Sequence, residues 1–151
     1  MNLRPYPEGI DCVWLASDRE GHLGAFITAG IGPIPVVALD AGNMPVEDVE
    51  EQLCQLPPVS QAQLLVSVNR PDDFIDLAER GLFVYDWTDV NRTGRDALHA
   101  YEPVAVPSKP IAVSSLPSDL AAFAETLRLR NVVFSAGGIV DIRVHLSCSA
   151  G

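Results

Sequence analysis

Residues 11–28 read DCVWLASDREGHLGAFIT, and this stretch decides the fold because two alternating segments flank a turn. Side chains in residues 11–16 and 22–28 alternate between two faces with the period of two that a strand requires. Residues 17–21 lie between these segments, with an aspartate early and Gly21 available for a positive φ, which is typical of a turn. The sequence therefore predicts a β-hairpin near the N-terminus.

Short apolar stretches beyond the hairpin predict the remaining strands of the sheet. They are rich in β-branched or aromatic residues and are bounded by glycine, proline or polar residues. The expected strands are residues 63–69, 82–88, 101–106, 131–134 and 140–146, with shorter extended pieces at 36–39 and 111–113. Residues 63–69 also fit the end of a helix, although their length and valine content favour a strand.

Three stretches with apolar residues at helical spacing predict three short helices. The first is expected at residues 45–56, with an apolar stripe of Val46, Val49, Leu53 and Leu56. The second is expected at residues 71–80, with Phe74, Ile75, Leu77 and Ala78 on its apolar side. The third is expected at residues 115–127, with a stripe of Leu116, Leu120, Phe123, Ala124 and Leu127. Asn43 is expected to cap the first helix and Gly81 to end the second. Helices interspersed among hairpin-like strands are typical of the α+β class, with a mainly antiparallel sheet and a single domain over residues 1–151.

The negative charge is concentrated in the first three fifths of the chain. The whole sequence has a formal net charge of −10. Residues 1–90 carry fifteen acidic side chains and four arginines, whereas residues 91–151 carry five acidic and six basic side chains. Phosphate backbones and anionic lipid surfaces repel such a chain, so we expect neither nucleic-acid binding nor membrane association.

Composition and cysteine usage favour a cytoplasmic protein. Residues 1–9 contain one arginine, two prolines and no apolar core segment, so a signal peptide is not expected. No stretch approaches the roughly 20 apolar residues of a spanning helix. Cys12, Cys54 and Cys148 are odd in number and far apart, which is typical of free thiols in a reducing compartment.

No catalytic or cofactor-binding motif is found in the sequence. Nothing reads Gly-x-Ser-x-Gly, no histidine pair has zincin spacing, and the glycines near Pro33 lack the third glycine of a phosphate cradle. We therefore expect no cofactor and no metal. A small-molecule enzyme or ligand-binding domain stays open as an alternative, with Asp86, Asp89, His99 and Tyr101 around a pocket.

The predicted strand at residues 82–88 carries Phe83, Tyr85 and Trp87 on one face. Such a face fits a sheet core beneath a helix. It also fits a binding patch, because tyrosine and tryptophan are enriched at interfaces. The sequence leaves both interpretations open.

Two of the predicted helices are acidic, and together they suggest a surface for a basic partner protein. If both helices turn their acids outward on one side, the surface is negative and would speed the association of a cationic partner. The candidate partner-binding residues are Glu47, Asp48, Glu50, Glu51, Asp72, Asp73 and Asp76, with Trp87 as an aromatic centre.

These features resemble those of bacterial immunity proteins of toxin delivery systems. The likeness is in the hairpin at residues 14–22, the Gly32-Pro33-Ile34-Pro35 connection and the segment 81–87. The resemblance implies a small, acidic, cytoplasmic protein that binds and blocks a cognate toxin, and it supplies no catalytic residue. A homodimeric scaffolding protein is a further alternative, because the mean hydropathy of +0.18 would suit burial at a subunit interface.

Overall fold

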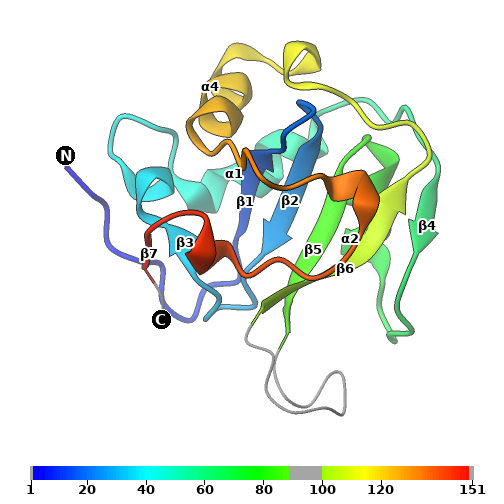
Figure 1. The fold of residues 1–151 in the computed structure, drawn as a ribbon, viewed down its shortest axis with the longest axis horizontal. Helices are drawn as coiled ribbons and strands as arrows, with labels where there is room; N and C mark the ends of the chain where they lie inside the picture. Colours follow the sequence, from blue (N-terminus) through cyan, green and yellow to red (C-terminus); the bar gives the residue numbers. More distant parts are fainter. Residues whose placement is uncertain (1, 89–99, 150–151) are drawn as a thin grey trace.

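A five-stranded sheet forms the centre of the computed structural model, which describes residues 2–88 and 100–149 (Figure 1). Its strands, in spatial order, are β1 (Val13–Ser17), β2 (Leu23–Ile27), β5 (Phe83–Thr88), β6 (Ala100–Pro107) and β4 (Ala62–Leu64). Neighbouring strands are antiparallel except β2 and β5, which are parallel. A second sheet pairs β3 (Ile34–Pro35) with β7 (Cys148–Ser149). The predicted α+β class with a mainly antiparallel sheet is confirmed.

The predicted N-terminal hairpin is present as β1 and β2. Its antiparallel register pairs Val13 with Ile27 at one end and Ser17 with Leu23 at the other. Gly21 has a φ of +81°, so the turn uses the conformation that glycine adopts without strain. Both faces of both strands are buried, which explains why the side chains on both faces are apolar or small.

The carboxylate of Asp18 organises the hairpin turn. Asp18 is fully buried, and its Oδ1 accepts hydrogen bonds from the backbone amides of Glu20 and His22, both at 2.9 Å. Its Oδ2 accepts a third, at 2.8 Å, from the amide of Phe134. A buried carboxylate needs such donors. Asp18 therefore joins the turn to a segment more than one hundred residues later.

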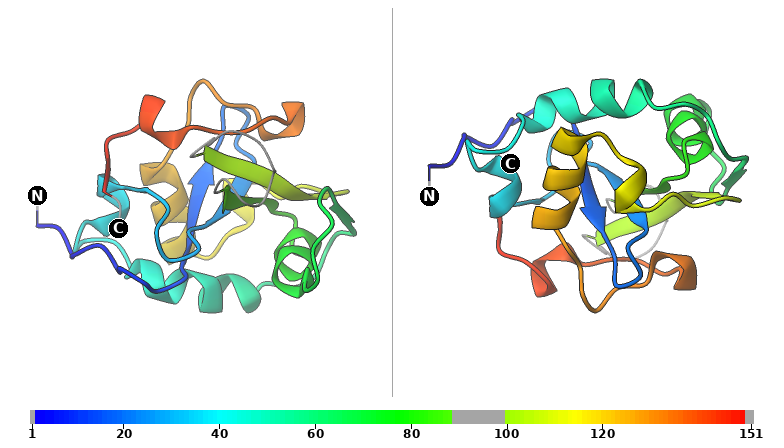
Figure 2. Two further views of the ribbon diagram at one scale, coloured as in Figure 1. Left: turned by 90° about the horizontal axis from the view of Figure 1, so that it is seen from below. Right: turned by 90° about the horizontal axis from the view of Figure 1, so that it is seen from above.

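Three α-helices surround the sheet: α1 (Val46–Cys54), α2 (Asp72–Glu79) and α4 (Ser118–Thr126). Figure 2 shows α1 and α2 on one face of the sheet, the C-terminal segment on the other, and α4 beside β1. The apolar stripe of α1 is buried as predicted, including Leu56 just beyond its end. The predicted Asn43 cap is wrong. The Asn43 side chain donates to the carbonyl of Val37 at 2.9 Å, and Pro45 occupies the N-cap without a side-chain bond.

Stacked aromatic rings fill the face of the sheet opposite α1 and α2. The rings of Trp14 and Phe26 stack at 4.3 Å between centroids, and those of Phe26 and Tyr85 at 4.7 Å. The Trp14 indole donates to the Tyr101 hydroxyl at 3.1 Å, and that hydroxyl donates to the carbonyl of Pro33 at 2.9 Å. Each buried polar tip therefore has a partner, as the cost of burying it requires.

The C-terminal segment covers these rings in place of the expected helix. The ring of Phe134 contacts those of Phe26, Phe83 and Tyr85 at 5.5–6.0 Å. One crowded point lies at Gly24, where a Cβ would come within 2.8 Å of the Phe134 ring. The aromatic face of β5 is thus core, and an irregular segment closes it.

Several predicted strands are wrong because their residues cross the sheet or turn away from it. Residues 131–134 and 140–146 contain the short 3-10 helices η3 (Phe134–Ala136) and η4 (Ile142–Val144). Residues 36–39 form the 3-10 helix η1 (Val36–Leu39), and residues 111–113 lead into η2 (Val113–Ser115). Residues 111–113 form only an isolated bridge, between Ala112 and His22, and residues 140–146 form only one between Val140 and Tyr101. Residues 89–99 lie outside the described residues.

Candidate functional site

Acidic side chains from three separate segments lie close enough to repel one another. Asp11 precedes β1, Glu50 lies on α1, and Asp73 lies on α2. Partial burial raises the pKa of Asp11, and the charge of Asp73 raises it further against a lowering hydrogen bond from the Ala29 amide. Partial burial also raises the pKa of Glu50, with the charges of Asp73 and Asp11 in addition. These three carboxyl groups form one electrostatic unit.

Two thiols show that the unit extends along both helices. Burial raises the pKa of Cys12 to about 11, and the charges of Glu47, Asp11 and Glu50 contribute. Burial likewise raises the pKa of Cys54, where Arg80 opposes the effect and Glu50, Asp76 and Asp73 add to it. We call the five carboxylates that act on one another and on these thiols the acidic surface: Asp11, Glu47, Glu50, Asp73 and Asp76.

Arg80 fixes the relative position of the two acidic helices. Its guanidinium donates to the carbonyls of Cys54 at 2.9 Å and Leu56 at 3.1 Å, at the end of α1. It also donates to the carbonyl of Asp76 at 2.9 Å and lies 3.9 Å from the carboxylate of that residue. The cation is favourable at the C-terminal end of α1 because it satisfies carbonyls that lack helical partners. Its charge offsets part of that of Asp76 and leaves the Asp11 side of the acidic surface uncompensated.

The remaining predicted residues fall into two groups. Asp48, Glu51 and Asp72 are exposed on the same two helices, outside the acidic surface as defined. Trp87 lies in the core with 9% of its surface exposed, and its ring packs edge-on against that of Tyr101 at 5.2 Å. The prediction that Trp87 is an aromatic centre of the acidic surface is therefore wrong. The alternation that aligns Trp87 with Phe83 and Tyr85 points its side chain into the core.

Two exposed isoleucines lie beside Asp11, whereas Trp87 is buried. Ile10 and Ile31 are each 52% exposed. The amide of Gly9 donates to the carbonyl of Gly30 at 3.0 Å, so the two loops lie side by side. Asp11 is tied to the same place, since its Oδ1 accepts from the Ala29 amide at 2.9 Å. Asp11 and both isoleucines could not be picked out from the sequence, because their proximity comes from long-range contacts and leaves no local pattern.

Of the four residues predicted around a small-molecule pocket, two lie in the core and two lie outside the described residues. Asp86 is buried on β5, opposite Glu102 of β6. The Tyr101 hydroxyl is engaged with Trp14 and Pro33, and burial raises its pKa well above the ordinary value. A phenol that burial keeps protonated, and whose hydroxyl is already engaged with two partners, is a structural group rather than a catalytic acid. Asp89 and His99 lie outside the described residues.

Asp18, Glu20 and His22 are a group with the composition of a metal site. Their ligand atoms lie within 4.8 Å of one another in the described part of the chain. The Asp18 carboxylate, however, already accepts the three backbone hydrogen bonds that shape the turn. The Nδ1 atom of His22 lies 3.9 Å from Glu20 and has no hydrogen-bond partner among the described residues. The group is explained by the turn, and we assign no ion to it.

The character of the helices and the comparisons with known proteins also bear on the site. In residues 2–88 and 100–149, every helix is too short or too polar to cross a bilayer. Searches against models of protein families, curated proteins and solved structures find no match to this chain. The acidic surface and the isoleucines beside it are therefore interpreted from their own geometry and charge.

Proposed function

We propose that this chain binds a basic partner protein through the acidic surface, as an immunity protein that blocks a cognate bacterial toxin. The contact is made by α1, α2 and the segment around Asp11, with Ile10 and Ile31 at its edge. Protein interfaces commonly combine apolar contacts with charged groups that orient the partner.

The observation that supports this proposal is the mutual repulsion of Asp11, Glu50 and Asp73. Beyond the effect of burial, the charge of Asp73 raises the pKa of Asp11, and the charges of Asp73 and Asp11 raise the pKa of Glu50. Carboxylates held close together in this way destabilise the free protein at neutral pH. Lysine or arginine side chains of a partner would relieve that repulsion on binding. The chain therefore keeps a surface whose electrostatic cost disappears in a complex with a cation-rich protein.

The class of partner follows from the sign and size of the charge. A toxin that acts on nucleic acid needs basic side chains to hold the phosphate backbone. A protein with a net charge of −10, all of the excess lying in the first three fifths, would occupy that basic surface in place of the substrate. Such an inhibitor needs no catalytic group of its own.

The test is the association kinetics with a toxin domain encoded beside this gene. Reversing two central charges, Glu50→Lys with Asp73→Lys, is expected to slow association about tenfold or more at low salt, and to flatten its dependence on ionic strength. The dissociation rate should change less, because electrostatic steering acts mainly on encounter.

A matched control carries the same change of charge elsewhere. Asp119→Lys with Glu125→Lys alters two exposed acids of α4, away from α1 and α2. This variant should associate nearly as fast as the unmodified chain. Equal slowing in both variants would show a general charge effect and count against the acidic surface. Failure of the purified toxin domain to bind the unmodified chain would overturn the proposed function.

A further inference from the structure

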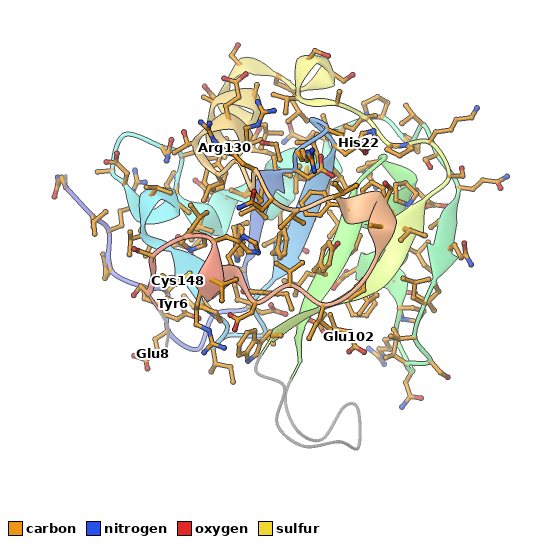
Figure 3. The ribbon with its side chains drawn as sticks, viewed as in Figure 1. Tyr6, Glu8, His22, Glu102, Arg130 and Cys148 are labelled. Carbon is orange, nitrogen blue, oxygen red and sulfur yellow. The ribbon has the colours of Figure 1, made fainter. Side chains whose placement is uncertain are left out.

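A second charged region lies at the turn end of the hairpin, away from the acidic surface. A hollow of about 450 Å³ opens there between the hairpin, the segment before α4 and the segment after it. Its walls include Gly21, Ser114, Glu125, Arg128 and Arg130. Figure 3 shows Arg130 at the same end of the sheet as His22. The volume is within the range of roughly 300–1,000 Å³ for small-molecule sites.

The fold sets both arginines on one side of an extended segment. Residues 127–129 run along the free edge of β1, where the amide of Ser17 donates to Leu127 and the amide of Leu129 donates to Ser17. Alternate side chains of an extended segment point in opposite directions. Leu127 and Leu129 are buried, and Arg128 and Arg130 are exposed toward the hollow.

The polar groups of the hollow have unused hydrogen-bonding capacity. Arg130 and the Ser114 hydroxyl have no side-chain hydrogen bond or ion pair within the described residues. Arg128 makes one long bond, 3.4 Å from its Nη2 to the carbonyl of Arg19. Two other arginines make several or shorter contacts: Arg80 caps α1, and Arg143 forms an ion pair with Asp141 at 2.9 Å. Arg128 and Arg130 differ from these two because most of their donors have no partner among the described residues.

We propose that this hollow binds a small molecule carrying a phosphate group, independently of the partner protein. Two guanidinium groups offer planar, paired donors that match the oxygens of a tetrahedral oxyanion, whereas one guanidinium already satisfies a carboxylate. The Ser114 hydroxyl supplies a further donor. A chain with net charge −10 repels free phosphate in general, so binding at this place depends on the two arginines.

Glu125 lines the same hollow, and its negative charge should oppose the binding of inorganic phosphate that the arginines favour. Its carboxylate can accept a hydrogen bond from a hydroxyl or amine on the rest of the ligand. Toward inorganic phosphate alone it is only a nearby like charge. Removing that charge with Glu125→Gln should therefore tighten the binding of inorganic phosphate.

The test uses inorganic phosphate as the probe, with chloride at matched ionic strength as the reference. At about 10 mM phosphate, we expect the Tm of the full chain to rise by about 2–4 °C, and amide resonances of Gly21 and Ser114 to shift on titration. The pair Arg128→Gln with Arg130→Gln should lose both effects. Glu125→Gln should lower the apparent Kd about two- to fivefold.

The matched control is Arg70→Gln, which removes an exposed arginine near α2, on another part of the protein. It should respond to phosphate as the unmodified chain does. Equal responses in the control and in the Arg128/Arg130 variant, or no shift at Gly21 in the unmodified chain, would overturn the phosphate site. Binding of a basic partner would be unaffected by either result, so the two proposals fail separately.

Discussion

The N-terminal hairpin and the C-terminal segment have nearly the same sequence pattern and opposite outcomes. Residues 11–28 alternate and form β1 and β2. Residues 140–146 alternate as cleanly, with Val140, Ile142, Val144 and Leu146 against polar neighbours, yet they form a 3-10 turn. In the described chain, the backbone of Val140 pairs with that of Tyr101 and the pairing stops there. Alternation therefore produces a strand only where a neighbouring backbone can accept and donate along its whole length.

The exposed fractions show what the C-terminal alternation means instead. Ile142 is 0% exposed and Val144 is 74% exposed, although a strand would place both on one face. In the hairpin, by contrast, both faces of each strand are buried. The C-terminal segment thus places single side chains such as Ile142 in the core as anchors, whereas the hairpin contributes two strands that are buried on both faces.

Removing Trp14 should cause the largest loss of stability. Trp14 is fully buried, stacks on Phe26 and donates to the Tyr101 hydroxyl. Trp14→Ala is expected to lower the free energy of unfolding by about 3–5 kcal/mol, through lost transfer energy and a cavity. Urea unfolding followed by circular dichroism measures this loss. Trp14→Phe, which keeps a ring but loses the indole donor, should cost clearly less, and a smaller loss for alanine than for phenylalanine would contradict the stacked core.

Two aliphatic positions of the C-terminal segment test the anchor interpretation. Ile142→Ala should lower the free energy of unfolding by about 2–4 kcal/mol, because it leaves a cavity in the core. Val144→Ala should change it by about 0.5 kcal/mol or less, as is usual for an exposed side chain. Similar losses at both positions in the same urea titrations would show that the segment is a strand with one buried face after all.

The smallest expected effect is on the pH dependence of stability. It should have opposite signs for Asp11, beside the hairpin, and Asp141, in the C-terminal segment. Burial and the charge of Asp73 raise the pKa of Asp11, and the Ala29 bond only partly opposes them. Hydrogen bonds from Arg143 lower the pKa of Asp141. Asp11→Asn should therefore stabilise the protein at pH 7 and Asp141→Asn should destabilise it, each by about 0.5 kcal/mol or less because both side chains remain partly exposed to water.

The sign of each effect follows from which state binds the proton more tightly. Folded Asp11 holds its proton more tightly than the unfolded chain, so its contribution is full below the unfolded pKa and is lost as the pH rises through the folded pKa. For Asp141 the order is reversed, and its contribution is lost as the pH falls through the folded pKa. Unfolding titrations at pH 7, 5 and 4 should show a weaker gain on acidification for Asp11→Asn than for the unmodified chain. An equal gain would contradict the repulsion on which the acidic surface rests.

Elements with their own local signals were predictable from sequence. Gly21 and an early aspartate mark the hairpin turn, and the stripe from Val46 to Leu53 marks α1. The capping of α1 was not predictable, since Asn43 bonds instead to Val37 in a neighbouring turn. Local patterns fix where an element lies, but side-chain partners beyond it decide how its ends are satisfied.

The candidate site was predictable only in part for the same reason. The charge of α1 and α2 is visible along the sequence, and it pointed to Glu50 and Asp73. The addition of Asp11 requires the packing of α1 against β1 and of α2 beside α1, and Arg80 holds that arrangement. Trp87 shows the converse, because alternation gave its face but not that both faces of the sheet are covered at β5.

The sequence by itself determined the α+β class, the hairpin, three helices and the location of the excess acid along the chain, because the elements follow from local side-chain patterns and the charge follows from the residues themselves. The tertiary structure alone decided that Asp11, Glu50 and Asp73 repel one another, that Arg128 and Arg130 share a hollow, and that residues 140–146 are not a strand. These features depend on contacts between distant segments. Their energies arise from burial and proximity in space, which no local spacing encodes.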